Sequence, residues 1–356
     1  MTNTFPAYFK KFVCIADKCP DTCCAGWQIV VDPESLERYG SLKGDYAEKI
    51  RSLIAVDEDG DSIFISKNNR CPFLLENGLC EMYCELDHDA LCRTCRQFPR
   101  HMTYFGARVE TGISLSCPEA ARLIMESPEP ITFETEETHG SILPTAIDPN
   151  LYFTLLSARK TAINILQNRE FAIENRIISF LLFCEKASAL IRKKEFEEVR
   201  ALNAKDFENA DSPVHSPLKA KKALAKYFAD FKSLEMLDSS WKEALEKAEN
   251  TRVPEAKSIE WEYEHMMIYF VFRYFMTAVF DGSLLPKAKF AAVAFIIIRR
   301  LQAEVIGSKA ERISTMQKYS KEVEHSASNM EFINSAIKKS RFYSVENLII
   351  ILEEMK

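Results

Sequence analysis

Cysteine is the residue type in this sequence whose number and spacing could support chemistry. Of the eleven cysteines, ten lie in the first third of the 356 residues, and only Cys184 lies beyond them. Thiols concentrated in one segment mean that either disulfides or metal ions hold that segment together. The ten are Cys14, Cys19, Cys23, Cys24, Cys71, Cys80, Cys84, Cys92, Cys95 and Cys117.

The first residues of the chain help to separate disulfides from metal. Residues 1–11 contain no apolar core of signal-peptide length, and Lys10 and Lys11 follow the apolar residues instead of preceding them. We therefore expect a cytoplasmic protein, and disulfides rarely persist in that reducing compartment. Because clustered thiolates there bind zinc or iron–sulfur clusters, the sequence predicts a metal-binding segment.

Nine of the ten clustered cysteines are candidate metal ligands. Cys84 follows Cys80 by four residues, which matches no metal spacing that we recognise, so we predict that Cys84 binds no metal. A 4Fe–4S cluster needs four thiolates, or three if one iron stays open, and structural zinc needs four ligands. Nine thiols suffice for one cluster and a second four-ligand site, or for one cluster with surplus core thiols. A single site should use at most one of Cys23 and Cys24, since adjacent side chains point in different directions. The candidates are Cys14, Cys19, Cys23, Cys24, Cys71, Cys80, Cys92, Cys95 and Cys117.

Turns and short helices must bring these thiols together. A strong turn signal at 77–78 lies between Cys71 and Cys80, which should therefore approach each other. Cys92 and Cys95 are three residues apart on a predicted helix capped by an aspartate at 87 or 89, so they should share one face. His88 and His101 could complete a zinc site, although a lone histidine near such a segment more often lies outside it.

Other local elements frame this segment. We expect strands at 28–31 and 62–66 and a hairpin over 102–115, which turns at Gly106 and has a bulge at Gly112.

Two helix starts are also predicted in this part of the chain. Asp32 should cap one helix, with Pro33 as its first residue. The residues 116–119 form a capping box that places Cys117 at a second helix N-terminus, where backbone amides should lower its thiol pKa.

The remainder of the sequence predicts a mainly α protein. The organisation is a small cysteine-rich N-terminal domain with short β-hairpins (1–125), an acidic linker (126–148) and an all-helical C-terminal domain (149–356). A polar loop is expected at 203–217. Apolar residues at helical spacing predict helices at 148–168, 171–194, 218–237, 239–250, 258–280, 284–306, 310–325, 330–339 and 345–355.

Composition excludes several classes of function. A net charge of −6 provides no basic surface for nucleic acid. The two most apolar runs, 266–280 and 290–298, are too short or too interrupted to span a bilayer, so we expect no membrane partner. No two of the ten glycines form a Gly-x-Gly pair, which removes both the dinucleotide-binding fingerprint and the P-loop.

The nine candidate cysteines lie in five short motifs of the N-terminal segment. These are Cys14…Cys19…Cys23-Cys24-Ala-Gly-Trp27, Cys71-Pro-Phe-Leu, Asn-Gly-Leu-Cys80, Leu-Cys92-Arg-Thr-Cys95-Arg-Gln-Phe-Pro-Arg100 and Leu-Ser-Cys117-Pro-Glu. They resemble the motifs of the flagellin lysine N-methylase family, within a wider group of zinc- or iron-chelating proteins. The helical part is also similar to that family, at 165–169 and over 269–300.

This resemblance implies transfer of a methyl group from S-adenosylmethionine to lysine side chains of flagellin, with a 4Fe–4S cluster required. Zinc is the alternative metal. Arg96 and Arg100 match the family motif and are the expected cofactor-binding residues, either balancing cluster charge or holding the carboxylate of S-adenosylmethionine. The catalytic base is not identified; the candidates near the motifs are Asp17, Asp21, Tyr104 and Glu110.

A second hypothesis belongs to a different class of function. The chain could be a non-catalytic interaction protein that zinc or an iron–sulfur cluster stabilises. The metal content and colour of anaerobically purified protein would discriminate between the two hypotheses.

Overall fold

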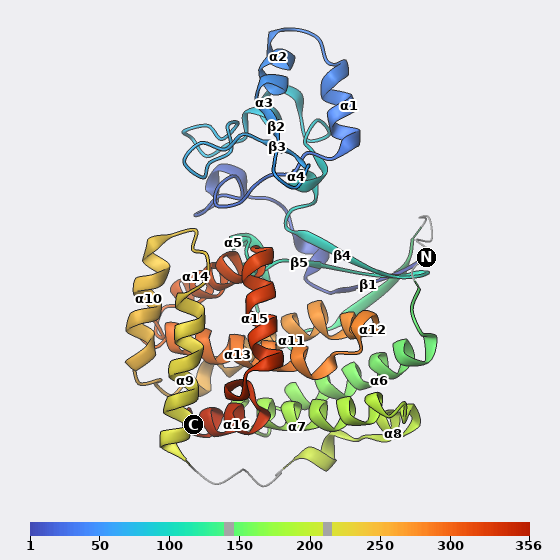
Figure 1. Cartoon of the computed structure of the whole chain (residues 1–356), viewed down its shortest axis with the longest axis vertical. Helices are drawn as coiled ribbons and strands as arrows, with labels where there is room; N and C mark the ends of the chain where they lie inside the picture. The colour runs from blue at the N-terminus through green and yellow to red at the C-terminus, as the bar shows by residue number, and fades with distance from the viewer. Residues whose placement is uncertain (139–145, 209–215) are drawn as a thin grey trace.

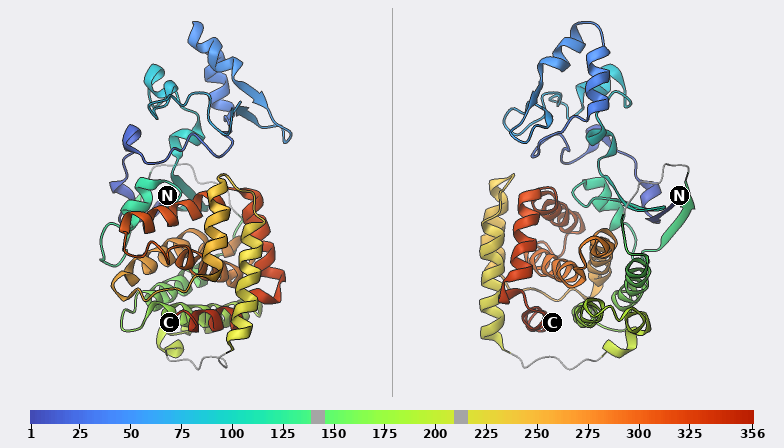
Figure 2. Two further views of the ribbon diagram at one scale, coloured as in Figure 1. Left: turned by 90° about the vertical axis from the view of Figure 1, so that its left-hand side faces the viewer. Right: turned by 45° about the vertical axis from the view of Figure 1, so that its right-hand side comes forward.

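The computed structural model describes residues 1–138, 146–208 and 216–356. Helices dominate this part of the chain, and the few strands lie in the N-terminal region, which confirms the mainly α prediction. Figure 1 shows a small lobe above a larger helical body. In both views of Figure 2 the lobe is distinct from the body, and the segments that join them lie between the two.

The small lobe has its own hydrophobic core, to which Tyr39, Ile50, Phe64 and Phe73 contribute. Strands β2 and β3 pair antiparallel within it. The elements of the lobe are α1 (Pro33–Ser41), α2 (Asp45–Ser52), β2 (Ile54–Val56), β3 (Ser62–Phe64), α3 (Glu81–Leu86) and α4 (Arg93–Gln97).

Asp32 organises one side of the lobe. Its side chain caps α1 by accepting a hydrogen bond from the amide of Ser35 at 3.1 Å, and Pro33 is the first helical residue, as predicted. The other carboxylate oxygen accepts from the amide of Arg93 at 2.7 Å, which joins α1 to α4. Burial opposes ionisation, but the hydrogen bonds outweigh it and lower the pKa of Asp32 to about 2.

Two predicted elements of the lobe are wrong in detail. The expected strand at 28–31 is reduced to an isolated bridge between Val30 and Ile63. The helix that carries Cys95 begins only at Arg93, with Cys92 as its cap, because α3 ends at Asp87 with a positive φ of 81°. The aspartates at 87 and 89 therefore cap no helix around these cysteines.

A four-stranded sheet lies between the lobe and the body. Its strands are β1 (Thr2–Pro6), β4 (Arg100–Phe105), β5 (Arg108–Ile113) and β6 (Phe133–Glu137), in the order β4–β5–β1–β6. The hairpin prediction is confirmed by β4 and β5, but the predicted bulge is wrong, since Gly112 pairs directly with His101. A Cβ atom at Gly112 would lie 2.6 Å from Nε2 of His101, so close approach of that ring explains the glycine.

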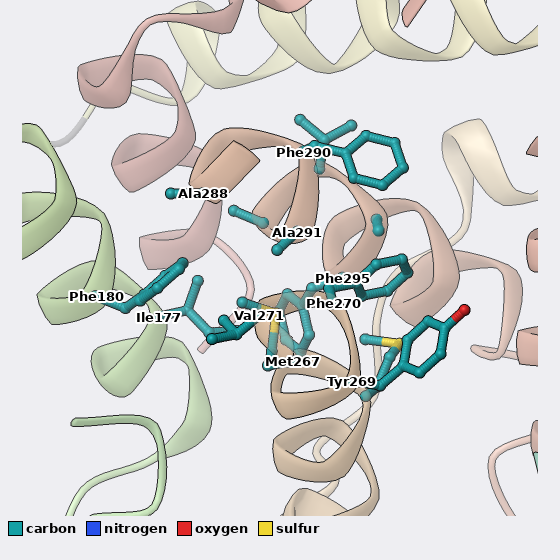
Figure 3. Packing of buried hydrophobic residues seen from close by; sticks show 14 of the residues in the cluster. Ile177, Phe180, Met267, Tyr269, Phe270, Val271, Ala288, Phe290, Ala291 and Phe295 are labelled. Atoms are coloured by element: carbon teal, nitrogen blue, oxygen red, sulfur yellow. The ribbon is translucent and has the colours of Figure 1, made fainter. Parts of the chain in front are cut away.

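The helical body consists of packed helices from all parts of 149–356. Ile177 of α7 points toward Met267 and Val271 of α11 (Figure 3). The ring of Phe290 of α13 packs against that of Phe270 of α11, with 5.6 Å between the ring centres. None of the helices in the described part of the chain is both long and apolar enough to cross a membrane. The larger helices are α6 (Pro149–Leu166), α7 (Ile173–Arg192), α9 (Pro217–Lys232), α10 (Ser239–Asn250), α11 (Glu260–Tyr274), α13 (Leu284–Leu301), α14 (Lys309–Tyr319), α15 (Ala327–Lys339) and α16 (Val345–Glu353).

The structure divides two of the predicted helices. The predicted helix at 258–280 becomes α11, a 3-10 turn (Phe275–Thr277) and α12 (Ala278–Asp281). The predicted helix at 310–325 becomes α14 and a π-helix, η6 (Ser320–Glu324). Short π-helical segments are frequent at functional sites, so η6 is a segment of interest.

Two segments, one predicted to be a linker and one for which no element was predicted, contain regular structure. Strand β6 falls inside the expected linker and pairs antiparallel with β1, while residues 139–145 of that linker lie outside the described part. The short helix α8 (Phe196–Ala201) was not predicted, and residues 209–215 of the expected loop also lie outside the described part. Phe105 and Ile113 of the sheet and Leu123 of α5 (Pro118–Ile124) share the core of the helical body.

Candidate functional site

All eleven cysteines are free thiols. Six of the predicted ligands come from three segments of the small lobe and lie close enough for their charges to interact: Cys23, Cys24, Cys71, Cys80, Cys92 and Cys95. Cys14, Cys19 and Cys117 form a second group, in which each of the first two affects the pKa of the third. The two groups adjoin, since the charge of Cys23 also raises the pKa of Cys19.

Two pairs of thiols are especially close. The Sγ atoms of Cys23 and Cys24 are 4.0 Å apart. A hydrogen bond between the thiols of Cys92 and Cys95 lowers the pKa of Cys92 and raises that of Cys95. This agrees with the prediction that Cys92 and Cys95 lie on neighbouring positions.

The donor set fits a thiolate-bound metal in its chemistry but not in its present geometry. Free, clustered thiols suit zinc or an iron–sulfur cluster. Among residues 1–138, 146–208 and 216–356, however, no three His, Cys, Asp or Glu side chains are arranged so that they could hold a metal ion. The ligand set therefore stays a prediction.

The prediction for the thiol of Cys117 is wrong. Cys117 is itself the cap residue of α5, and Ser116, the expected cap, hydrogen-bonds His325 instead. Burial raises the pKa of Cys117 to about 12, although hydrogen bonds from the amides of Ala120 and Glu119 act in the opposite direction. The rise in the thiol pKa caused by desolvation therefore outweighs the lowering caused by the amides at the helix N-terminus.

The remaining cysteines occupy contrasting positions. Cys84 is exposed on α3, whereas Cys184 is fully buried in the core of the helical body.

Arg96 is half-buried on α4, and the guanidinium of Arg100 lies 5.0 Å from the ring centre of Phe12. The role of both arginines in cofactor binding stays a prediction.

The cysteine loop, residues 14–27 with Cys14, Cys19, Cys23 and Cys24, contacts α14 and η6 of the helical body. The carboxylate of Asp21 accepts hydrogen bonds from Nζ of Lys321 at 2.7 and 2.9 Å and from Nε2 of Gln317 at 2.9 Å. The indole of Trp27 stacks on the ring of His325, with 4.8 Å between the ring centres. Burial lowers the pKa of His325 to about 4, with help from the nearby charge of Arg273.

A cleft of about 880 Å³ lies beside this contact. Asp21 and Gly26 of the cysteine loop line one side of it, and Gln317 and Lys321 line another. Apolar groups include Ile15, Leu237, Trp241 and Ile313. Clefts of this size between two parts of a protein commonly bind small molecules.

The four candidate bases differ in their burial and in their partners. Asp17 is exposed, and Tyr104 is half-buried on β4. Glu110 is buried and forms a bidentate ion pair with Arg159, so it is unavailable to a substrate. Of the four, Asp21 is the one that lines the cleft.

A buried polar cluster lies behind η6 and was not predicted. The Oε2 atom of Glu324 accepts hydrogen bonds from the hydroxyls of Tyr269 (3.0 Å) and Tyr274 (2.6 Å) and lies 3.3 Å from Nε of Arg273. The other carboxylate oxygen has no hydrogen-bond partner among the described residues. An arginine inside the apolar run 266–280 was the available signal for this cluster.

Gly26 permits the close contact between the cysteine loop and the helical body. Its φ is +95°, and an added Cβ would lie 3.2 Å from Cδ1 of Leu237 and 3.5 Å from Cε of Lys321. Replacing Gly26 by alanine should lower the free energy of unfolding by about 1–2 kcal/mol, measured by chemical denaturation. Gly60 also has a positive φ but open space around it, so Gly60→Ala controls for backbone strain. Equal losses in the two variants would contradict a role for the contact.

The helical body is the part of the chain that matches a known protein family. The family described as the FliB lysine N-methylase C-terminal domain matches residues 159–351, more than half of the chain. The chain belongs to this family. It is 33% identical over 143 residues, 36% of its own length, to the flagellar biosynthetic protein FliU of Salmonella muenchen, of which it covers 80%.

Two further relatives carry an enzyme name. The lysine-N-methylases of Salmonella typhimurium and Salmonella choleraesuis are each 33% identical to this FliB-family chain over 143 residues, 36% of its length. The chain covers 34% of the length of each of these two relatives. No solved structure matches the chain.

Proposed function

We propose that this chain is a protein-lysine N-methyltransferase that acts in the cytoplasm and transfers methyl groups from S-adenosylmethionine to lysine side chains of flagellin. The observation that carries this proposal is the family match over residues 159–351. The names of two relatives, lysine-N-methylase, and of a third, flagellar biosynthetic protein, support the reaction and the substrate.

We propose the cleft beside the cysteine loop as the active site. Both the loop and the helical body contribute residues to it. Asp21 is the candidate base that lines the cleft, and although its carboxylate is paired with Lys321, its side chain is 33% exposed, unlike that of the buried Glu110. The reaction requires a neutral amine, because only the lone pair of the lysine nitrogen can attack the methyl carbon as the sulfonium–carbon bond breaks. A lysine ammonium must therefore lose a proton, and a carboxylate beside it can accept that proton.

The metal is a separate part of the proposal. We propose that the nine candidate cysteines include the ligands of a 4Fe–4S cluster, with zinc as the alternative metal. The three-segment grouping of six thiols in the small lobe supports this position. A metal bound there would hold together three segments that otherwise share a small hydrophobic core.

The test is a methylation assay on the whole chain. Protein purified without oxygen and reconstituted with iron and sulfide is incubated with flagellin and S-adenosylmethionine. Peptide mass spectrometry should find mass increments of 14 Da per added methyl group on flagellin lysines, by the mass of the CH2 unit gained. Reactions without S-adenosylmethionine or without the protein should show none. A metal-loaded chain that methylates no flagellin lysine would instead support the non-catalytic interaction protein.

A further inference from the structure

The ammonium of Lys321 lies in a well-defined set of acceptors on the cysteine loop. Its Nζ donates to both carboxylate oxygens of Asp21, at 2.9 and 2.7 Å, and to the carbonyl oxygen of Thr22 at 3.2 Å. These contacts satisfy the three donors of a primary ammonium. Gln317 fixes the carboxylate, since its amide donates to Asp21 at 2.9 Å and to the carbonyl of Ser116 at 2.8 Å.

An aromatic ring completes this set of acceptors. Nζ of Lys321 lies 5.4 Å from the ring centre of Trp27, within the range of a cation–π interaction. The indole is held in place by stacking on His325 and by contact with Phe98, whose ring centre is 5.4 Å away. A carboxylate, a carbonyl and an indole together form the kind of site that recognises an amine cation.

This ammonium site borders the cleft. Asp21, Gln317 and Lys321 all line the cleft. The side chain of Lys321 is 14% exposed and that of Asp21 is 33% exposed, so a ligand in the cleft can reach the carboxylate. The flexible four-carbon stem of lysine allows Lys321 to leave without movement of the backbone.

We infer that Asp21, the carbonyl of Thr22 and Trp27 form the binding site for the lysine side chain of the protein substrate, and that Lys321 fills this site when no substrate is bound. The identity of the ligand as a protein lysine rests on the proposed function. Asp21 and Thr22 directly precede the Cys23–Cys24 pair in the chain and Trp27 follows it, so the site places the acceptor amine on the cysteine loop itself. Lys321 then competes with the substrate for the same contacts.

The test measures binding of a lysine side chain without any methyl donor. Nα-acetyl-lysine methylamide is titrated into the whole protein by calorimetry, and its uncharged norleucine counterpart serves as the ligand control. Lys321→Met should bind the lysine compound about tenfold more tightly than the unaltered protein, as expected if the site is open about one tenth of the time. Lys321→Met combined with Asp21→Asn should lose this binding. The norleucine compound should bind none of these proteins.

A matched variant separates competition from a general effect of losing an ion pair. Lys232 forms a partly buried ion pair with Glu249 at 2.8 Å, on helices α9 and α10. Lys232→Met should leave binding unchanged. Thermal unfolding of each variant verifies that it is folded at the titration temperature. Equal or weaker binding by Lys321→Met, or retained binding in the double variant, would overturn the inference.

The methylation assay then distinguishes this inference from the proposed function. If both hold, Lys321→Met lowers KM for flagellin about tenfold, because the binding site is then open all the time. If the unaltered protein and its variants bind the lysine compound as expected but the unaltered protein methylates nothing, the proposed function fails and the site stands. If Asp21→Asn methylates flagellin with an unchanged KM, the binding site and the role of Asp21 as base both fail, whereas methyl transfer to flagellin stands.

Discussion

Replacing Cys92 or Cys95 by serine is expected to remove iron from the reconstituted protein, whereas replacing Cys84 by serine leaves the iron content unchanged. Cys92 is 1% exposed within the core of the small lobe, and its thiol is hydrogen-bonded to that of Cys95. Cys84 is exposed on α3. A serine hydroxyl is a poor substitute for a thiolate ligand, so loss of one essential ligand should abolish cluster binding.

Iron and sulfide per chain, together with the visible absorption spectrum, measure this effect under anaerobic conditions. Cys184 supplies a second control from the helical body, and alanine is the better replacement there, because serine would bury an unpaired hydroxyl in the core. Equal iron loss in all four variants would show that the ligand set is misassigned. A colourless unaltered protein that contains only zinc would refute the cluster itself.

Replacing Glu110 by glutamine should lower the free energy of unfolding by about 3–5 kcal/mol, because it leaves a buried guanidinium without its counter-charge. Glu110 on β5 and Arg159 on α6 form two hydrogen bonds, at 2.6 and 2.5 Å. Their side chains are only 7% and 6% exposed. This ion pair joins the sheet to the helical body, so its loss should affect the whole folding unit.

Chemical denaturation measures this change, and an exposed ion pair provides the control. Glu126 pairs with Arg122 at 3.3 Å, with side chains 39% and 50% exposed, so Glu126→Gln should cost less than about 1 kcal/mol. Replacing both buried partners, by Glu110→Leu and Arg159→Met, should recover much of the loss, since no unpaired charge remains. A similar cost for Glu110→Gln and Glu126→Gln would contradict the burial of the pair.

Much of the fold followed from local patterns in the sequence. Helical spacing of apolar residues predicted the helices of the body, as in α6 and α7, and the turn at Gly106 predicted the β4–β5 hairpin. The cap at Asp32 was also predictable, because a cap depends on residues a few positions apart. The concentration of cysteines identified the thiol-rich segment, and the thiol group itself indicated soft metal ligands.

Long-range burial decided the properties that the sequence could not indicate. The pKa of Cys117 is raised because the helical body covers it, although the helix N-terminus alone predicts the opposite. Glu110 was a candidate base by position, but Arg159, 49 residues away, takes both of its oxygens. Desolvation and pairing across the fold depend on which surfaces meet, and spacing along the chain does not contain that information.

The sequence by itself therefore determined the mainly α fold, the thiol-rich segment and most helix positions, since these depend on neighbouring residues. Only the tertiary structure decided that Lys321 of η6 meets Asp21 and that His325 stacks on Trp27. Some 300 residues separate the partners in each case, and their contact arises because the helical body packs against the cysteine loop. The candidate site is a product of that packing, which no local pattern specifies.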